Sequence, residues 1–216
     1  MSEIKNCPNC NTSIKNGLLS SVKLLTKKKV FVINEYHDSE SDGYCSKCGN
    51  ELYVKYNVAL KNERIELTNR MQNLIKNIPV ISTHSPLNWN YDVLDMVTGQ
   101  TTTGTGVISE FTSTFTDLFG AQSERHNSKL KAGEDMCFAQ LRMQTLNRGG
   151  NAVIATDIDY SELGATKGMI MVCMAGTSVK LKNTELLGEE RAKMLTRLVT
   201  VYDRLRHLNP YSVDEY

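Results

Sequence analysis

Two pairs of closely spaced cysteines constrain this chain more than any other feature. Two residues separate Cys7 from Cys10, and two separate Cys45 from Cys48, which gives the pattern C-x2-C-x34-C-x2-C. Such spacing lets both sulfurs of a tight turn face one point, so two turns can close a tetrahedral site. Four soft thiolates favour Zn²⁺, with iron as the chemical alternative. A catalytic zinc would usually include His or carboxylate, so we expect one structural Zn²⁺ per chain.

The residues around these cysteines suggest a small metal-stabilised module. Pro8 presets φ in the first turn, and Gly49 stands where a positive φ would turn backbone N–H groups toward the thiolates. The runs Lys29–Asn34 and Glu51–Tyr56 are typical of β-strands in their β-branched, aromatic or alternating residues. We therefore expect a zinc ribbon over residues 1–60, for which the metal supplies much of the folding free energy.

Composition limits the class of protein. The 216 residues suffice for one medium domain and a small module, and 40% hydrophobic with 23% charged residues is typical of a globular protein. A net charge of +1 argues against a strongly basic nucleic-acid binder. The first ten residues lack the apolar core of a signal peptide, and the apolar run 169–176 is too short to span a bilayer. We expect a soluble, cytoplasmic protein, in which cysteines bind metal rather than form disulfides.

A connector helix is predicted over residues 61–79. Apolar residues recur there at spacings near three and four, with Asn62 as the expected N-cap and Pro79 as the stop. We expect this helix to join the ribbon to a second domain.

The second domain, residues 80–183, alternates strand and helix patterns and gives an α+β fold class. Its helix around Leu130–Thr145 should end at Gly149-Gly150. An amphipathic helix then occupies the C-terminal segment 184–216, from Leu187 to Leu205. The remaining patterns predict strands at 80–83, 91–97, 152–160 and 168–179, and a helix at 107–119.

Three motifs of this domain, in the same order along the chain, resemble those of a known family. Gly149–Ile154 followed by Asp157–Tyr160 resembles the GANAVVG…DIDY segment of the YbjQ-like family, labelled a heavy-metal-binding domain. Met169–Val179 resembles its closing MLMVSASGTAV strand, and Val97–Gln100 with Asp117–Gly120 stands where the family has VSGE and DIFGGR segments. The resemblance covers about residues 80–181. It implies a small α+β fold that assembles into a ring, pentameric in the family, by sharing strands between subunits.

Two further groups are candidate sites. Asp157 and Asp159, two apart on a predicted strand, should leave the same face as Val153 and Ala155. They could share a cation or act as acid and base, or they could pair with arginine or cap a turn at a subunit junction. Lys27–Lys29 could contact phosphate, or they could guard a solvated edge strand.

Three hypotheses of function follow. The first is a zinc-binding, non-enzymatic homo-oligomer that presents zinc ribbons to a protein partner, since the sequence shows no catalytic constellation. The second is nucleic-acid binding through the ribbon and its lysines. The third is labile metal binding at the Asp157–Asp159 pair.

Overall fold

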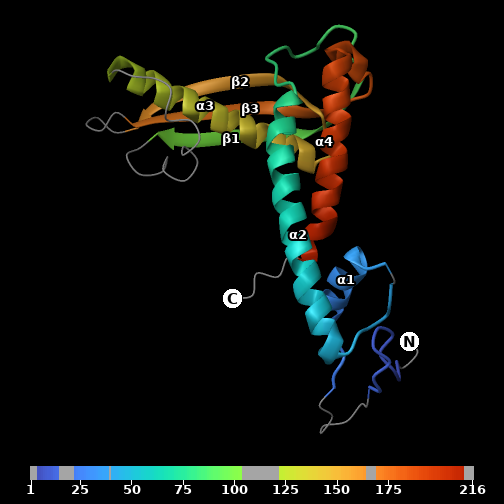
Figure 1. Cartoon of the computed structure of the whole chain (residues 1–216). Coiled ribbons are helices and arrows are strands. Elements are labelled where there is room, and N and C mark those ends of the chain that lie inside the picture. Colours follow the sequence, from blue (N-terminus) through green and yellow to red (C-terminus); the bar gives the residue numbers. More distant parts are fainter. Residues whose placement is uncertain (1–3, 15–21, 39, 104–121, 164–168, 212–216) are drawn as a thin grey trace. The chain divides into compact units, whose positions relative to one another are not determined.

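The chain forms two compact units (Figure 1). The computed structural model describes residues 4–14, 22–38, 40–103, 122–163 and 169–211. Unit 1 consists of Met1–Met71 and Thr200–Tyr216, and unit 2 of Gln72–Val199.

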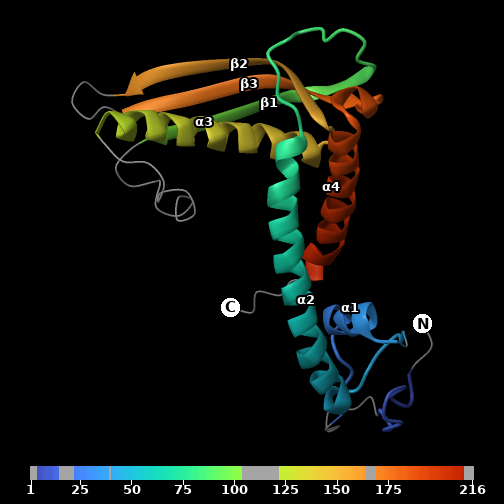
Figure 2. The ribbon, with the colours of Figure 1, turned by 45° about the horizontal axis from the view of Figure 1, so that its top comes forward.

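Unit 2 is built on a three-stranded antiparallel sheet. Its strands are β1 (Tyr91–Thr103), β2 (Ala152–Leu163) and β3 (Met169–Leu181), with β3 in the centre. Helix α3 (Gln122–Asn147) lies along one face of this sheet (Figure 2). The predicted α+β class, three of the four strands and the second helix are confirmed. The helix predicted at 107–119 lies outside the described residues.

Two apolar clusters hold the sheet. Toward α3, Val172 and Met174 of β3 pack with Cys137 and Leu141 of the helix, because alternate residues of a strand leave the same face. On the opposite face, the second cluster contains Ala152, Ile154, Val179 and Leu181. Both faces of the sheet therefore contribute to the core, and at the start of β2 Val153 belongs to the first cluster while its neighbours Ala152 and Ile154 belong to the second.

Helix α3 also closes part of the outer edge of β1. Gln144 accepts a hydrogen bond from Thr98 N and donates one to Thr98 O, at 3.4 and 2.5 Å. Gln140 does the same for Gln100, at 2.9 and 3.2 Å. Unpaired N–H and C=O groups of an edge strand attract other strands. Here, two side-chain amides occupy them.

The outer edge of β2 is covered over its first residues by the segment before β1. Val80 forms an isolated parallel bridge with Val153, Ile81 N donates to Val153 O at 3.0 Å, and Ala155 N donates to Thr83 O at 3.0 Å. The strand predicted at 80–83 is thus reduced to a single bridge with flanking hydrogen bonds.

Helix ends in unit 2 follow local chemistry. After α3, Gly149 has φ 77°, as expected for a helix C-terminus. Helix α4 (Glu189–Leu208) follows Gly188, whose φ is 92°. The C-terminal helix is confirmed, although Leu187 ends the preceding 3-10 turn η2 (Thr184–Leu187).

Unit 1 differs from the predicted zinc ribbon. Lys29–Asn34 belongs to helix α1 (Lys27–Tyr36), and Glu51–Tyr56 to helix α2 (Ser46–Leu74), so both strand predictions were wrong. Among the described residues of this unit, β-structure is limited to bridges between Asn6 and Ser13 and between Leu24 and Cys45.

The pattern of burial explains the correction. Tyr53, Leu60 and Leu67 of α2 are buried at intervals of seven residues, two helical turns apart. Val54, in contrast, is 65% exposed. The predicted connector helix is therefore the second half of α2, followed by the 3-10 turn η1 (Ile75–Asn77), and Asn62 lies inside the helix rather than at its N-cap.

Candidate metal centre

The first cysteine-bearing turn is formed by residues 6–13. The bridge between Asn6 and Ser13 closes the turn, and Cys7 N donates a hydrogen bond to Thr12 O at 2.9 Å. Asn11 N donates to Cys7 O at 2.8 Å, with a φ of 55° at Asn11. Asparagine tolerates this left-handed conformation better than most residues. The turn thus brings Cys7 and Cys10 to one side.

The second turn leads directly into α2. Cys45 precedes the helix and Cys48 lies in its first turn, so one helical turn separates the two sulfurs. The expectation of a positive φ at Gly49 was wrong, because Gly49 is helical. Its small size matters instead, since a Cβ there would lie 2.7 Å from Leu25 Cδ1 and 2.9 Å from Tyr44 Cβ.

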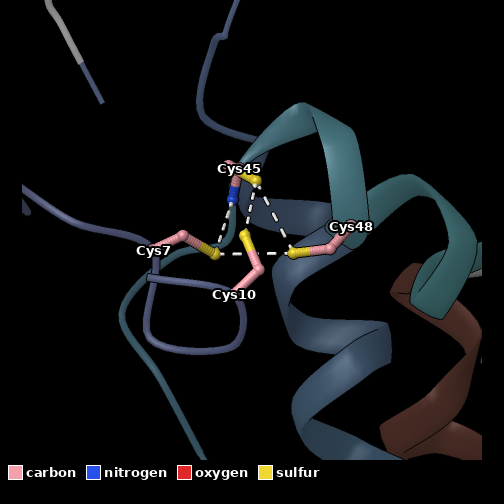
Figure 3. Close-up of side chains that lie close together, drawn as sticks. All are labelled: Cys7, Cys10, Cys45 and Cys48. Atoms are coloured by element: carbon pink, nitrogen blue, oxygen red, sulfur yellow. Dashed lines mark hydrogen bonds between the residues drawn. The ribbon is translucent and has the colours of Figure 1, made fainter. Parts of the chain in front are cut away.

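The four sulfurs converge (Figure 3). All lie within 4.8 Å of one another, and this is the one group of three or more Cys, His, Asp or Glu side chains with metal-site geometry in the described parts of the chain. The Sγ atoms of Cys7 and Cys48, of Cys10 and Cys45, and of Cys45 and Cys48 are each 3.5 Å apart. Zn–S bonds of about 2.3 Å in a tetrahedron place sulfurs about 3.8 Å apart, whereas a disulfide needs about 2.05 Å. The geometry fits a four-coordinate metal.

Three of the thiols have pKa values shifted from the usual value, in different directions. Hydrogen bonds from the hydroxyl and backbone of Thr12 lower the pKa of exposed Cys10 to about 6. Burial raises the pKa of Cys48 to about 12. Burial opposes ionisation of Cys7 too, but hydrogen bonds from backbone N–H groups hold its pKa below the usual value. Thiols this close lose their protons in successive steps, and a divalent cation that replaces those protons favours all four thiolates together.

Sequence reasoning found the four cysteines but missed two supporting residues. Thr12 Oγ1 lies 3.1 Å from Cys10 Sγ, and Asn11 supplies the positive φ expected at Gly49. The available signal was an asparagine directly after the first cysteine pair.

Asp157 and Asp159 lie in unit 2 and do not join the cysteine cluster. A bulge between Ile154 and Asp157, with Ala155 at φ 52°, shifts the register by one residue. Both carboxylates therefore share a face with Ile154 rather than Val153, contrary to the prediction. Both are exposed, and they stand opposite Ala175 and Cys173 of β3.

Lys27–Lys29 form the first turn of α1, so the prediction of a lysine-guarded edge strand was wrong. Lys29 Nζ lies 4.8 Å from the centre of the Tyr53 ring and donates to Asn50 Oδ1 at 3.4 Å. Lys27 and Lys28 are exposed. Only these two lysines of the group therefore point to solvent.

Helices of the described residues include none that is both long and apolar enough to cross a membrane.

One family model matches a range that lies within unit 2. The family described as "Putative heavy-metal-binding" (YbjQ_1) matches residues 80–182. A UPF0145 protein of Anoxybacillus flavithermus is 37% identical over 89 residues, which cover 41% of this chain and 83% of that protein. A UPF0145 protein of Geobacillus kaustophilus is 34% identical over 43% of this chain and 86% of its own length. One from Actinobacillus pleuropneumoniae serotype 5b is 28% identical over 50% of this chain and 99% of its own length.

Among solved structures, a protein of unknown function of the DUF74 family from Pediococcus pentosaceus is similar. It has 12% sequence identity and covers 49% of this chain and 98% of its own, with a TM-score of 0.35.

Proposed function

The chain belongs to the YbjQ-like (UPF0145) family, described as "Putative heavy-metal-binding", through residues 80–182, and we propose that it is a metal-binding protein whose unit 1, outside that match, holds one Zn²⁺. The convergence of four sulfurs from two separate turns carries this proposal. Four thiolates complete a tetrahedron and leave no open position for substrate, which favours a structural rather than a catalytic metal. We propose a non-enzymatic role for this site.

Metal content and substitution test the zinc site. Elemental analysis of protein purified without chelator should find one zinc per chain. Cys45→Ser should lose it, because three thiolates bind structural zinc far more weakly than four. Cys173→Ser is the matched control, since Cys173 lies outside the cluster. Metal-free wild-type protein, or Cys45→Ser with full zinc, would refute the proposal, and iron in place of zinc would correct the choice of metal.

We further propose that the metal-stabilised unit presents a surface to a protein partner, and that the family domain assembles copies of the chain into a ring. Several identical units on one ring raise the effective affinity for a partner. This proposal is supported by the family relationship of residues 80–182. Gln140 and Gln144 already occupy the edge of β1 at Thr98 and Gln100, so contacts between subunits must use other parts of the sheet.

Native mass spectrometry tests the ring. Micromolar protein should give one discrete assembly whose zinc content equals its number of chains. A monomer at that concentration removes the ring, while leaving the zinc site to be judged by metal content alone.

One observation favours nucleic-acid binding as a second candidate. Lys27 and Lys28 are exposed in the first turn of α1, which contains no acidic residue. The N-terminus of a helix attracts anions, and lysines there add to the effect. Gel shifts at low salt should then show binding that weakens in Lys27→Glu/Lys28→Glu, but not in the exposed control Lys61→Glu. An absence of binding at low salt would eliminate this candidate.

A further inference from the structure

The C-terminal residues of unit 1 are held to α1 and α2 by a network of charged groups centred on Arg204. Arg204 Nε and Nη2 lie 2.7 and 3.1 Å from the two carboxylate oxygens of Glu63 in α2. Its Nη1 donates to Glu35 in α1. One guanidinium thus joins three helices, in the two-pronged geometry that suits arginine.

Neighbouring contacts extend the same attachment. His207 Nε2 lies 3.0 Å from Glu35 Oε2. Beyond the helix, the 3-10 turn η3 (Asn209–Tyr211) stacks Tyr211 on Phe31 of α1, with ring centroids 3.3 Å apart and planes at 10°. Leu208 is fully buried. The attachment therefore combines ion pairs, ring stacking and apolar burial.

The carboxylates of this network are held in their charged forms. The hydrogen bonds from Arg204 lower the pKa of Glu63, against the effect of partial burial. Partial burial alone would raise the pKa of Glu35, but His207 and Arg204 outweigh it and lower that pKa as well. The pairs are thus favourable at neutral pH.

The other end of α1 is tied to the cysteine cluster. Leu24 forms a bridge with Cys45, Leu25 N donates to Tyr44 O at 3.0 Å, and Ser46 N donates to Lys23 O at 2.6 Å. The chain enters α1 two residues after Leu25. Whatever fixes the backbone at Cys45 therefore also fixes the start of α1.

Contacts between α1 and α2 complete the connection. Lys29 lies over the ring of Tyr53, and two turns further along α1, Tyr36 donates to Glu63 Oε2 at 2.5 Å. Helix α1 thus touches the metal-binding turns at its first residues and the C-terminal attachment at its last.

We propose that metal loading at the four cysteines and docking of residues 200–211 are coupled through α1, so that loss of the metal releases the C-terminal segment. This inference depends on the metal site proposed above. A metal that orders the backbone at Cys45 holds α1 in place, and α1 supplies Phe31 and Glu35 to the segment. By thermodynamic reciprocity, docking of the segment strengthens metal binding by the same factor.

Hydrogen exchange of the full chain tests the first half of this coupling. Zinc-loaded protein and protein treated with a chelator are compared by mass spectrometry. Amides of residues 200–208 should exchange about 10-fold faster without zinc, which corresponds to a typical coupling free energy between two sites. Amides of β3 in unit 2 should keep their exchange rates. Unchanged exchange at 200–208 in protein that demonstrably loses one zinc would overturn the coupling and leave the zinc site intact.

Competition with a chromogenic chelator tests the second half. Arg204→Gln should raise the dissociation constant for zinc about 10-fold, by the same reciprocity. Arg206→Gln is the matched control, because it removes an equal charge from an exposed position of the same turn. It should leave the dissociation constant for zinc unchanged. Tyr211→Ala removes the ring stacked on Phe31 and should also weaken zinc binding. This second variant tests the coupling independently, in case Arg204→Gln does not fold. Wild-type affinity in both Arg204→Gln and Tyr211→Ala would overturn the inference, whereas a wild-type protein without zinc affinity would overturn the proposed function itself.

Discussion

At the scale of single residues, two glycines determine how closely neighbouring segments approach. Gly49 lets α2 begin against Leu25, and Gly99 lets α3 cross β1 near Cys137. A Cβ at Gly99 would lie 2.7 Å from Cys137 O and 2.9 Å from Cys137 Cα. Backbone atoms cannot rotate away as a side chain can, so this contact limits which residue can stand there.

Gly99→Ala should therefore lower the free energy of unfolding of unit 2. The new methyl group forces α3 away from the sheet, at a cost of about 1–3 kcal/mol, as overpacked cores show. Urea unfolding, followed by the fluorescence of Trp89, measures this free energy, since Trp89 is the one tryptophan of the chain and belongs to unit 2. Thr98→Ser, at an exposed neighbouring position, should change the free energy of unfolding by less than about 0.5 kcal/mol. Equal stability of the two variants would contradict the close contact.

The ion pairs of Glu63 and Glu35 predict that the stability of unit 1 depends on pH. Both folded-state pKa values lie below the usual value. Their stabilisation is therefore complete above the unfolded pKa of about 4.3 and is lost as pH falls through the lower folded pKa. Glu63→Gln should cost about 1 kcal/mol at pH 7, given partial solvent screening.

Acidification should then reduce the difference between wild type and Glu63→Gln. Chemical unfolding of both zinc-loaded proteins, followed by circular dichroism between pH 7 and pH 3, provides the comparison, because removal of the metal would itself release Arg204 under the coupling proposed above. Zinc content is measured at each pH, since thiolates release zinc in acid as well, and the two proteins are compared at equal zinc content. A difference that stays constant down to pH 3 would show that the charge of Glu63 does not stabilise unit 1 through these pairs.

Sequence predicted the grouping of the four cysteines because their spacing is a short-range property of two turns. It misplaced Asp157 and Asp159 because one inserted residue in β2 reverses every later side chain. A bulge depends on pairing with β3 and on the segment at Thr83, which no local pattern contains.

At the scale of elements, unit 2 followed its hydrophobic pattern and unit 1 did not. In β2 and β3, the strand patterns and the tertiary pairing agree. In α1, Val30 and Ile33 are three apart and both buried, which a helix needs, while the β-branched content of the same run favoured a strand. Tertiary burial overrode local propensity there.

The edge of β1 yields a prediction at this scale. Gln140→Ala/Gln144→Ala should expose the amides of Thr98 and Gln100, so that both exchange with solvent faster than in wild type. Stability should fall by about 1–2 kcal/mol, because water replaces part of the lost bonding. Exchange measured by NMR resolves the two amides.

Gln144→Glu is the matched control for this variant. It keeps an oxygen that accepts from Thr98 N but loses the N–H group that donates to Thr98 O. Protection at Thr98 should then be intermediate. Wild-type exchange in the double alanine variant would mean that the glutamines do not close this edge.

At the scale of the whole molecule, unit 1 combines both ends of the chain. Sequence showed an amphipathic C-terminal helix but gave no sign that Arg204 pairs with Glu35 and Glu63, because ion pairs between residues more than 140 positions apart leave no local pattern. Prediction from sequence therefore succeeded for the family domain and for the convergence of the four cysteines, and failed for the architecture around them.

Removal of zinc should affect the two units unequally. A metal present a thousandfold above its dissociation constant stabilises the unit that binds it by about 4 kcal/mol. Chelation should thus lower the melting transition of circular dichroism, to which α1 and α2 contribute, more than that of Trp89 fluorescence. Equal shifts of both signals, or none, would contradict a metal confined to unit 1.

The pairing of two glutamines with β1 has a consequence for how the protein behaves when crowded. An incoming foreign strand would find those main-chain groups already engaged, and it would have to displace two amide partners before it gained any of its own. The edge of β1 at these residues therefore cannot readily nucleate fibril growth, in which sheets extend by adding strands from other chains.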